Sequence, residues 1–180
     1  MLSSRLRARC SSAEFICTGS LKNFQSSFCK IGRDGTGKAG LTKARGATTK
    51  GVLFSMIPEE AITLDAVEGN GYDRLDGCLI MGDDGNEYTA FSYISVSPKP
   101  NLLPSDWYLA LIHAGAQEHK LDGIEHLTDH PWCVDKFTEN TARQDALKAL
   151  GRAGHSDWPS LISPLPPEAH PAAVESSQRG

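Results

Sequence analysis

The chain has 180 residues, of which 39% are hydrophobic and 22% charged, and its formal net charge is −4. These values are typical of a soluble protein with a real hydrophobic core. No apolar run approaches the length of a membrane span, and the five cysteines include no CxxC pair, which argues against a disulfide framework and a zinc knuckle. We therefore expect packed thiols, a reducing compartment and a cytoplasmic protein with no membrane partner.

The charge is unevenly distributed. Residues 1–50 hold ten Lys or Arg against Glu14 and Asp34, a balance of +8, and the remainder of the chain has a balance of −12. Basic segments often bind nucleic acid, but this one has few aromatic residues and no recognised binding motif. A basic flank around a site for a small anionic molecule is the favoured interpretation, with no nucleic-acid partner. Binding of polynucleotides through residues 1–50 is the alternative.

The first fifty residues predict a helix, strands and a loop. Residues 2–10 suit a short basic helix with Leu2 and Leu6 one turn apart, although an Arg- and Ser-rich, acid-poor start is also typical of a transit peptide. Strand character begins near Phe15 and returns over residues 21–31. Residues 31–51 are rich in glycine and lysine with no apolar period, which predicts a long loop.

Within that predicted loop, residues 32–38 match GxxxxGK, the pattern of phosphate-binding loops. The following residue is Ala39, where such loops need a Ser or Thr for magnesium, and no apolar strand leads directly into the pattern. A mobile loop is therefore favoured over a nucleotide site.

The stretch from Pro58 to Tyr72 predicts a helix and a turn. Pro58 suits the first helical position, and Gly69 and Gly71 supply the backbone freedom that ends the helix. Glu68 is the unusual residue, because a carboxylate in the last turn faces the negative end of the helix dipole. The stretch by itself favours a solvated glutamate, and a group that takes up and releases a proton is the alternative. The predicted apolar stripe consists of Ala61, Ile62, Leu64 and Val67.

The remaining chain predicts a hairpin and two further helices. An apolar strand over residues 51–56 precedes the helix at Pro58, and strands over residues 76–81 and 87–96 flank a turn over 82–86. A helix over residues 106–120 contains Gly115, whose position in mid-helix indicates close approach of another element. A last helix is predicted over residues 138–150, and the Pro- and Ser-rich residues 152–180 are expected to be a disordered tail.

Few side chains suit catalysis or metal binding. His126, His130 and Cys133 invite a metal interpretation, but Pro131 argues against the continuous helix that HxxxH spacing needs. No serine or cysteine lies in a recognised nucleophile motif. The candidates that remain are Glu68, with Asp65 one turn away, and the tyrosines Tyr72, Tyr88, Tyr93 and Tyr108.

Four segments occur in an order that resembles the γ-glutamylcyclotransferase-like family. They are GVLFSM, LDAVEGNGYDR, DGCLIMGDDGNEYTAFSYIS and WYLALIHAGAQEHKL, and the resemblance covers about residues 2–125. It implies an α+β fold with a small barrel-like mixed sheet, flanking helices and a cavity at one end. On this basis residues 1–125 form the domain, residues 126–151 a helical extension and residues 152–180 the tail.

The resemblance also implies a reaction and a site. The reaction is the cyclisation of a γ-glutamyl compound, which releases 5-oxo-L-proline and an amine or amino acid without metal or cofactor. Glu68 matches the family's catalytic glutamate, a general acid and base, and Tyr108 matches a tyrosine that contacts substrate. Tyr72 and Met1 are the further substrate-binding candidates, and a homodimer is the assembly kept open.

The start of the chain departs from the family pattern. The family opens with a strand that runs into a Tyr-Gly-Ser-Asn loop, whereas this chain begins with residues similar to those that follow it, with Met1 at or near its last position. We therefore expect the first strand and the loop to be absent and a sheet edge to be left unpaired. A non-catalytic domain that binds small molecules or partners is the alternative to the enzyme.

Overall fold

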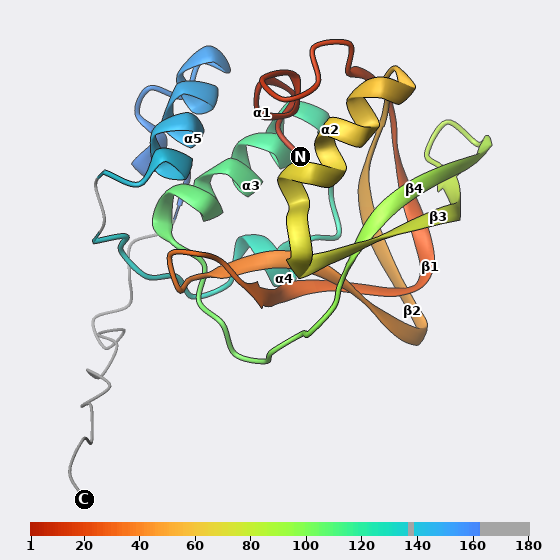
Figure 1. Ribbon diagram of the computed structural model, residues 1–180, viewed down its shortest axis with the longest axis horizontal. Coiled ribbons are helices and arrows are strands. Elements are labelled where there is room, and N and C mark those ends of the chain that lie inside the picture. The colour runs from red at the N-terminus through yellow and green to blue at the C-terminus, as the bar shows by residue number, and fades with distance from the viewer. Residues whose placement is uncertain (137–138, 163–180) are drawn as a thin grey trace, which may run out of the picture.

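The computed structural model describes residues 1–136 and 139–162 (Figure 1). Its strands are β1 (Glu14–Ile31), β2 (Gly37–Ser55), β3 (Tyr72–Gly82) and β4 (Glu87–Ser95). Its α-helices are α1 (Ser3–Arg7), α2 (Pro58–Glu68), α3 (Asp106–His119), α4 (Glu125–Thr128) and α5 (Thr141–Arg152). Two short 3-10 helices are η1 (Gly69–Gly71) and η2 (Trp158–Leu161).

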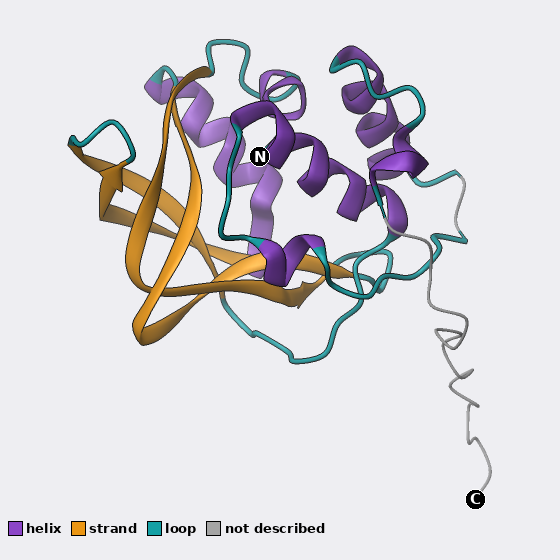
Figure 2. Cartoon of the chain, turned by 180° about the vertical axis from the view of Figure 1, so that it is seen from behind, coloured by secondary structure: helices purple, strands orange, loops and turns teal. Residues whose placement is uncertain are grey.

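The strands form a closed barrel in the order β1-β2-β4-β3. Neighbouring strands are antiparallel except for β2 and β4, which run parallel, so the sheet is mixed. The larger helices lie together on one side of the barrel (Figure 2). The α+β fold with a barrel-like mixed sheet and flanking helices is thus confirmed.

The expectation of an unpaired sheet edge was wrong. β2 reaches β4 and pairs with it at Leu41 and Ile94, which closes the barrel. The approach depends on Gly40, because a Cβ at this position would overlap the Ser95 hydroxyl and lie 3.0 Å from the Cys29 sulfur. A glycine beside the pairing position therefore leaves room for the Ser95 and Cys29 side chains where β2 meets β4.

The predicted loop over residues 31–51 was also wrong for most of its length. Residues 37–51 belong to β2, which pairs with β1 from Gly37 to Ser55. The composition misled because strand pairing and burial against neighbours outweigh the weak strand preference of Gly, Ala and Lys. The GxxxxGK segment is the tight turn of this hairpin rather than a strand-to-helix loop, and the Lys38 ammonium pairs with Asp34 at 2.8 Å.

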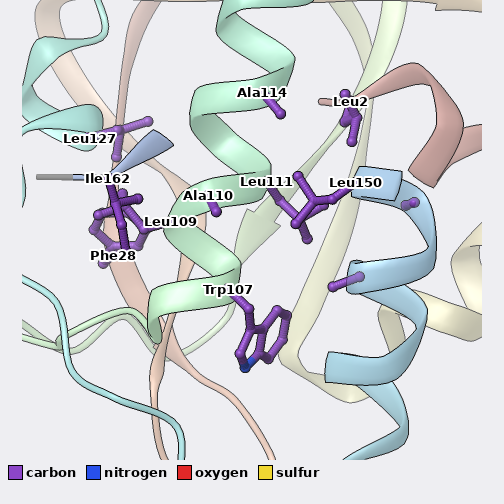
Figure 3. Close-up of a cluster of buried hydrophobic side chains, with 12 residues drawn as sticks. Leu2, Phe28, Trp107, Leu109, Ala110, Leu111, Ala114, Leu127, Leu150 and Ile162 are labelled. Carbon is purple, nitrogen blue, oxygen red and sulfur yellow. The ribbon is translucent and has the colours of Figure 1, made fainter. Parts of the chain in front are cut away.

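The main core forms around α3. Trp107, Leu109, Ala110, Leu111 and Ala114 of this helix are buried against Leu2, Phe28, Leu127, Leu150 and Ile162 (Figure 3). These contacts bring the start of the chain, β1, α4, α5 and the residue after η2 onto one helix. In contrast, the predicted stripe of α2 is only half buried, because Ile62 and Val67 are 70% and 48% exposed.

The end of the described chain packs on the same core. α5 begins after its Asn140 cap, whose side chain accepts a hydrogen bond from the Ala142 amide, and Ala146, Ala149 and Leu150 are buried. Trp158 and Leu161 of η2 pack against the core cluster beside Ile162. The predicted tail thus contributes packed residues as far as 162, and the rest of it, residues 163–180, lies outside the described residues.

The predicted packing of the thiols is confirmed. Cys10, Cys17, Cys29 and Cys78 are buried and Cys133 is partly buried, and all five are free thiols. Within residues 1–136 and 139–162, no helix is long and apolar enough to cross a membrane.

Gly115 brings α3 against the first residues of the chain, as its position in mid-helix predicts. A Cβ on Gly115 would lie 2.9 Å from the Leu2 amide nitrogen and 3.0 Å from the Met1 carbonyl carbon. The contact holds α1 on α3, together with a hydrogen bond from the Ser3 amide to the Glu118 carboxylate at 2.8 Å. This contact matters for the site because the chain from Met1 to Arg9 forms part of its wall.

We expect Gly115→Ala to lower the free energy of unfolding by about 1–3 kcal/mol, because the added methyl group has no space against backbone atoms. Gly151→Ala in α5 is the matched control, since a Cβ there meets no atom within 4 Å. The control should raise the free energy of unfolding by about 0.5–1 kcal/mol through helix propensity alone. Urea unfolding of the two variants measures both values, and equal stabilisation by both would contradict the close contact.

Candidate active site

A cavity of about 560 Å³ lies between the barrel and the helices. Its wall is formed by α1 and the turn after it, the end of α2, and α3. Residues of all four strands complete the wall, including Tyr72 at the start of β3. All four residues that the sequence analysis placed at the site line it, namely Met1, Glu68, Tyr72 and Tyr108. The fold therefore brings together residues that are separated by as many as 107 positions in the chain.

Glu68 is the last residue of α2, and the helix ends because Gly69 adopts a positive φ of 62°. The Glu68 side chain is 20% exposed, and its Oε1 lies 3.3 Å from Nη1 of Arg9. This ion pair fixes the position of one of the two carboxylate oxygens. Among the described residues of the cavity wall, Glu68 is the only carboxylate.

Tyr72 and Tyr108 meet on the backbone of Ala39 in β2. The Tyr72 hydroxyl donates to the Ala39 carbonyl at 2.6 Å, and the Ala39 amide donates to the Tyr108 hydroxyl at 3.1 Å. Burial, and then the charge of Glu68, raises the pKa of Tyr108 to about 12, and burial also raises the pKa of Tyr72. Both phenols are therefore neutral at physiological pH.

The two hydroxyls differ in what they offer to a ligand. The Tyr72 hydroxyl already donates its proton to the Ala39 carbonyl. The Tyr108 hydroxyl only accepts a hydrogen bond, and no acceptor for its own proton is found within the described part of the chain. Tyr108 can therefore donate a hydrogen bond into the cavity. An oxyanion or a carboxylate is the natural acceptor for such a group.

The other carboxylate and tyrosines of the sequence analysis make contacts elsewhere. Asp65 accepts a hydrogen bond from Tyr93 at 2.5 Å and pairs with Arg74 at 3.2 Å. Tyr88 donates to Asp84 in the hairpin turn at 2.6 Å. Tyr93 also lines the cavity, whereas Asp65 and Tyr88 do not, and none of these contacts reaches Glu68, Tyr72 or Tyr108.

Basic residues on the cavity wall were missed by the search for individual site residues. They are Arg5, Arg9, Lys30, Lys38 and Lys50. The signal that indicates them is the +8 balance of residues 1–50, which favours a site for a small anion but does not show which of the ten cations face it. α1 carries Arg5, the turn after α1 carries Arg9, β1 carries Lys30, and β2 carries Lys38 and Lys50.

The three residues considered for a metal do not converge. Nε2 of His126 lies 3.0 Å from the Ser26 hydroxyl, the His130 ring packs on Phe28, and the Cys133 thiol donates to the Pro104 carbonyl. The described residues contain no group of His, Cys, Asp and Glu that is arranged to hold a metal ion.

The barrel and its flanking helices define a small α+β protein with a partly open cavity, and the Glu68 carboxylate lies on the wall of that cavity. Its fold is that of gamma-glutamyl cyclotransferase. The structure of a protein described by that name matches it with a TM-score of 0.66 at 23% sequence identity, over 82% of this chain and 92% of the other. The resemblance inferred from the sequence motifs is thereby confirmed at the level of the fold.

Two other solved structures are similar. The human protein LOC79017 gives a TM-score of 0.66 at 25% identity, over 82% of this chain and 92% of the other. YkqA from Bacillus subtilis gives a TM-score of 0.51 at 20% identity, over 64% of this chain and 42% of the other. In sequence comparisons no family model matches the chain, and no curated protein matches it significantly.

Proposed function

We propose that the protein is a γ-glutamylcyclotransferase with Glu68 as its general acid and base. The observation that supports this proposal best is the position of Glu68 on the cavity wall, in a fold shared with gamma-glutamyl cyclotransferase. Tyr72 and Tyr108 lie on the same wall and match the order of motifs that carries the resemblance.

The proposed reaction is intramolecular, so the substrate itself provides much of the required proximity. The α-amine of the γ-glutamyl group attacks its own γ-carbonyl carbon and closes a five-membered ring. Glu68 removes a proton from the α-ammonium group and later donates it to the leaving nitrogen as the amide bond breaks. A second proton leaves the attacking nitrogen by the same route as the ring closes, so two of the three ammonium protons reach the leaving nitrogen through Glu68. One hydrogen then remains on the 5-oxoproline nitrogen, and the amine is released as its ammonium form.

The tetrahedral intermediate of this reaction carries an oxyanion. The Tyr108 hydroxyl, with its pKa of about 12, stays protonated, and we assign it as a hydrogen-bond donor to that oxyanion. Arg9 holds Glu68 in place through the 3.3 Å ion pair, which leaves the second carboxylate oxygen, Oε2, for proton transfer.

The direct test is incubation of the full chain with a set of γ-glutamyl dipeptides and chromatographic measurement of 5-oxoproline. We expect 5-oxoproline and the free amino acid in equal amounts. Binding of the dipeptides by calorimetry without any product would contradict the enzyme and support the non-catalytic alternative.

A further inference from the structure

The cavity wall carries more positive charge than its neighbours neutralise. Three of its five cations have a carboxylate partner. Arg9 pairs with Glu68 at 3.3 Å, Lys38 with Asp34 at 2.8 Å, and Lys50 with Asp83 at 2.9 Å. Arg5 and Lys30 form no ion pair with any carboxylate in residues 1–136 and 139–162. Among the described residues, two cations on the wall therefore have no carboxylate in an ion pair with them and can bind an anionic ligand.

Arg5 lies in an environment that disfavours its charge. Burial, followed by repulsion from Arg9, lowers the pKa of its guanidinium. Its hydrogen bond to the Ala142 carbonyl is long, at 3.5 Å. An incoming anion would relieve both the desolvation and the repulsion. Arg5 precedes Arg9, the partner of Glu68, by four residues, so it belongs to the side of the cavity where the proposed proton transfer begins.

Lys30 lies on β1, next to the turn that follows Glu68. Its ammonium is 4.8 Å from the centre of the Tyr72 ring, a cation–π contact that orients the side chain. The backbone of Gly71 forms the other support, because a Cβ there would overlap the Lys30 Cε and lie 3.0 Å from its Nζ. A glycine in η1 thus provides the space in which Lys30 reaches the cavity.

Two unpaired cations suit a substrate with two carboxylates. In a γ-glutamyl amino acid, one carboxylate shares its carbon with the attacking ammonium, and the other is on the leaving amino acid. Arg5 interacts electrostatically with both Arg9 and Glu68, so we assign the first carboxylate to Arg5. On the basis of the proposed function, we propose that Lys30 binds the second carboxylate and makes the site selective for γ-glutamyl amino acids over γ-glutamyl amines that lack it.

The test compares γ-glutamylalanine with γ-glutamylethylamide, which is the same compound with the second carboxylate replaced by hydrogen. We expect the wild-type kcat/KM to favour the dipeptide roughly 10- to 100-fold, the value of one charged hydrogen bond. In Lys30→Gln this preference should disappear because kcat/KM falls for the dipeptide, whereas kcat/KM for the ethylamide should stay unchanged. Gly71→Ala, which displaces Lys30 without removing its charge, should act in the same direction, and Lys30→Arg should restore most of the preference.

Lys43→Gln is the matched control, because Lys43 is an exposed lysine on β2 outside the cavity wall. It should keep the wild-type ratio. Equal loss of turnover on both compounds in Lys30→Gln, or no wild-type preference, would overturn the carboxylate site while leaving the cyclotransferase intact.

If neither compound yields 5-oxoproline, the proposed function is overturned. In that case the dissociation constants of both compounds, measured by calorimetry with wild type and Lys30→Gln, still decide the carboxylate site. Tighter binding of the dipeptide that disappears in Lys30→Gln supports the site, and equal binding of the two compounds rejects it.

Discussion

Glu68→Gln is expected to reduce 5-oxoproline formation by about 10²–10⁴-fold, the contribution of a general acid and base. The amide keeps an oxygen that can accept the Arg9 hydrogen bond now formed at 3.3 Å, so the local structure should persist. It has no proton to exchange, so both proposed transfers are lost. Initial rates of product release at saturating γ-glutamyl dipeptide measure the effect on kcat.

Two further variants separate chemistry from structure. Glu68→Asp keeps the carboxylate but shortens the side chain by one methylene group. Because a displacement of about 1 Å can lower the reaction rate roughly 10²-fold, we expect kcat to fall by about that factor. Glu59→Gln changes an exposed carboxylate in the first turn of the same helix, outside the cavity wall, and should leave turnover unchanged. Turnover in Glu68→Gln close to that of the wild type would contradict the assigned role, provided circular dichroism shows that the variant is folded.

The sequence was most informative where one local cause determines the structure. Pro58 and Gly69 mark the two ends of α2 because each sets a backbone angle that no partner needs to supply. The turn after β3 was predictable for the same reason, since Gly85 adopts a φ of 86° within it. Gly115 predicted a close neighbour, but nothing local indicates that the neighbour is the chain at Met1 and Leu2.

The sequence was least informative where distant segments decide the outcome. β2 is a strand because β1 pairs along its length, and its own composition favours a loop. The barrel closes between Leu41 and Ile94, which are 53 positions apart, because Gly40 admits Ser95. Likewise, the unpaired state of Arg5 and Lys30 depends on where every carboxylate lies, and charge counts along the chain do not contain that information.

Trp107→Ala is expected to have the largest effect on stability, lowering the free energy of unfolding by about 3–5 kcal/mol. Trp107 is 1% exposed at the centre of the α3 core, and its indole Nε1 donates to Asp135 at 2.7 Å. Its ring also lies 4.9 Å from the Lys38 ammonium. Since small domains have only about 5–15 kcal/mol in total, this loss removes a large share of the stability.

The same residue couples the core to the site. Trp107 lies on the cavity wall and its ring packs edge-on against Tyr108 at 5.9 Å, so a void at position 107 also frees the phenol that we assign to the oxyanion. Trp107→Phe keeps most of the volume and loses the bond to Asp135, which predicts a smaller loss of about 1–2 kcal/mol. Trp158→Ala, a partly buried position at the edge of the same cluster, is the control. Urea unfolding followed by far-ultraviolet circular dichroism gives all three values, and a loss in Trp107→Ala no larger than in Trp158→Ala would show that α3 does not organise this core.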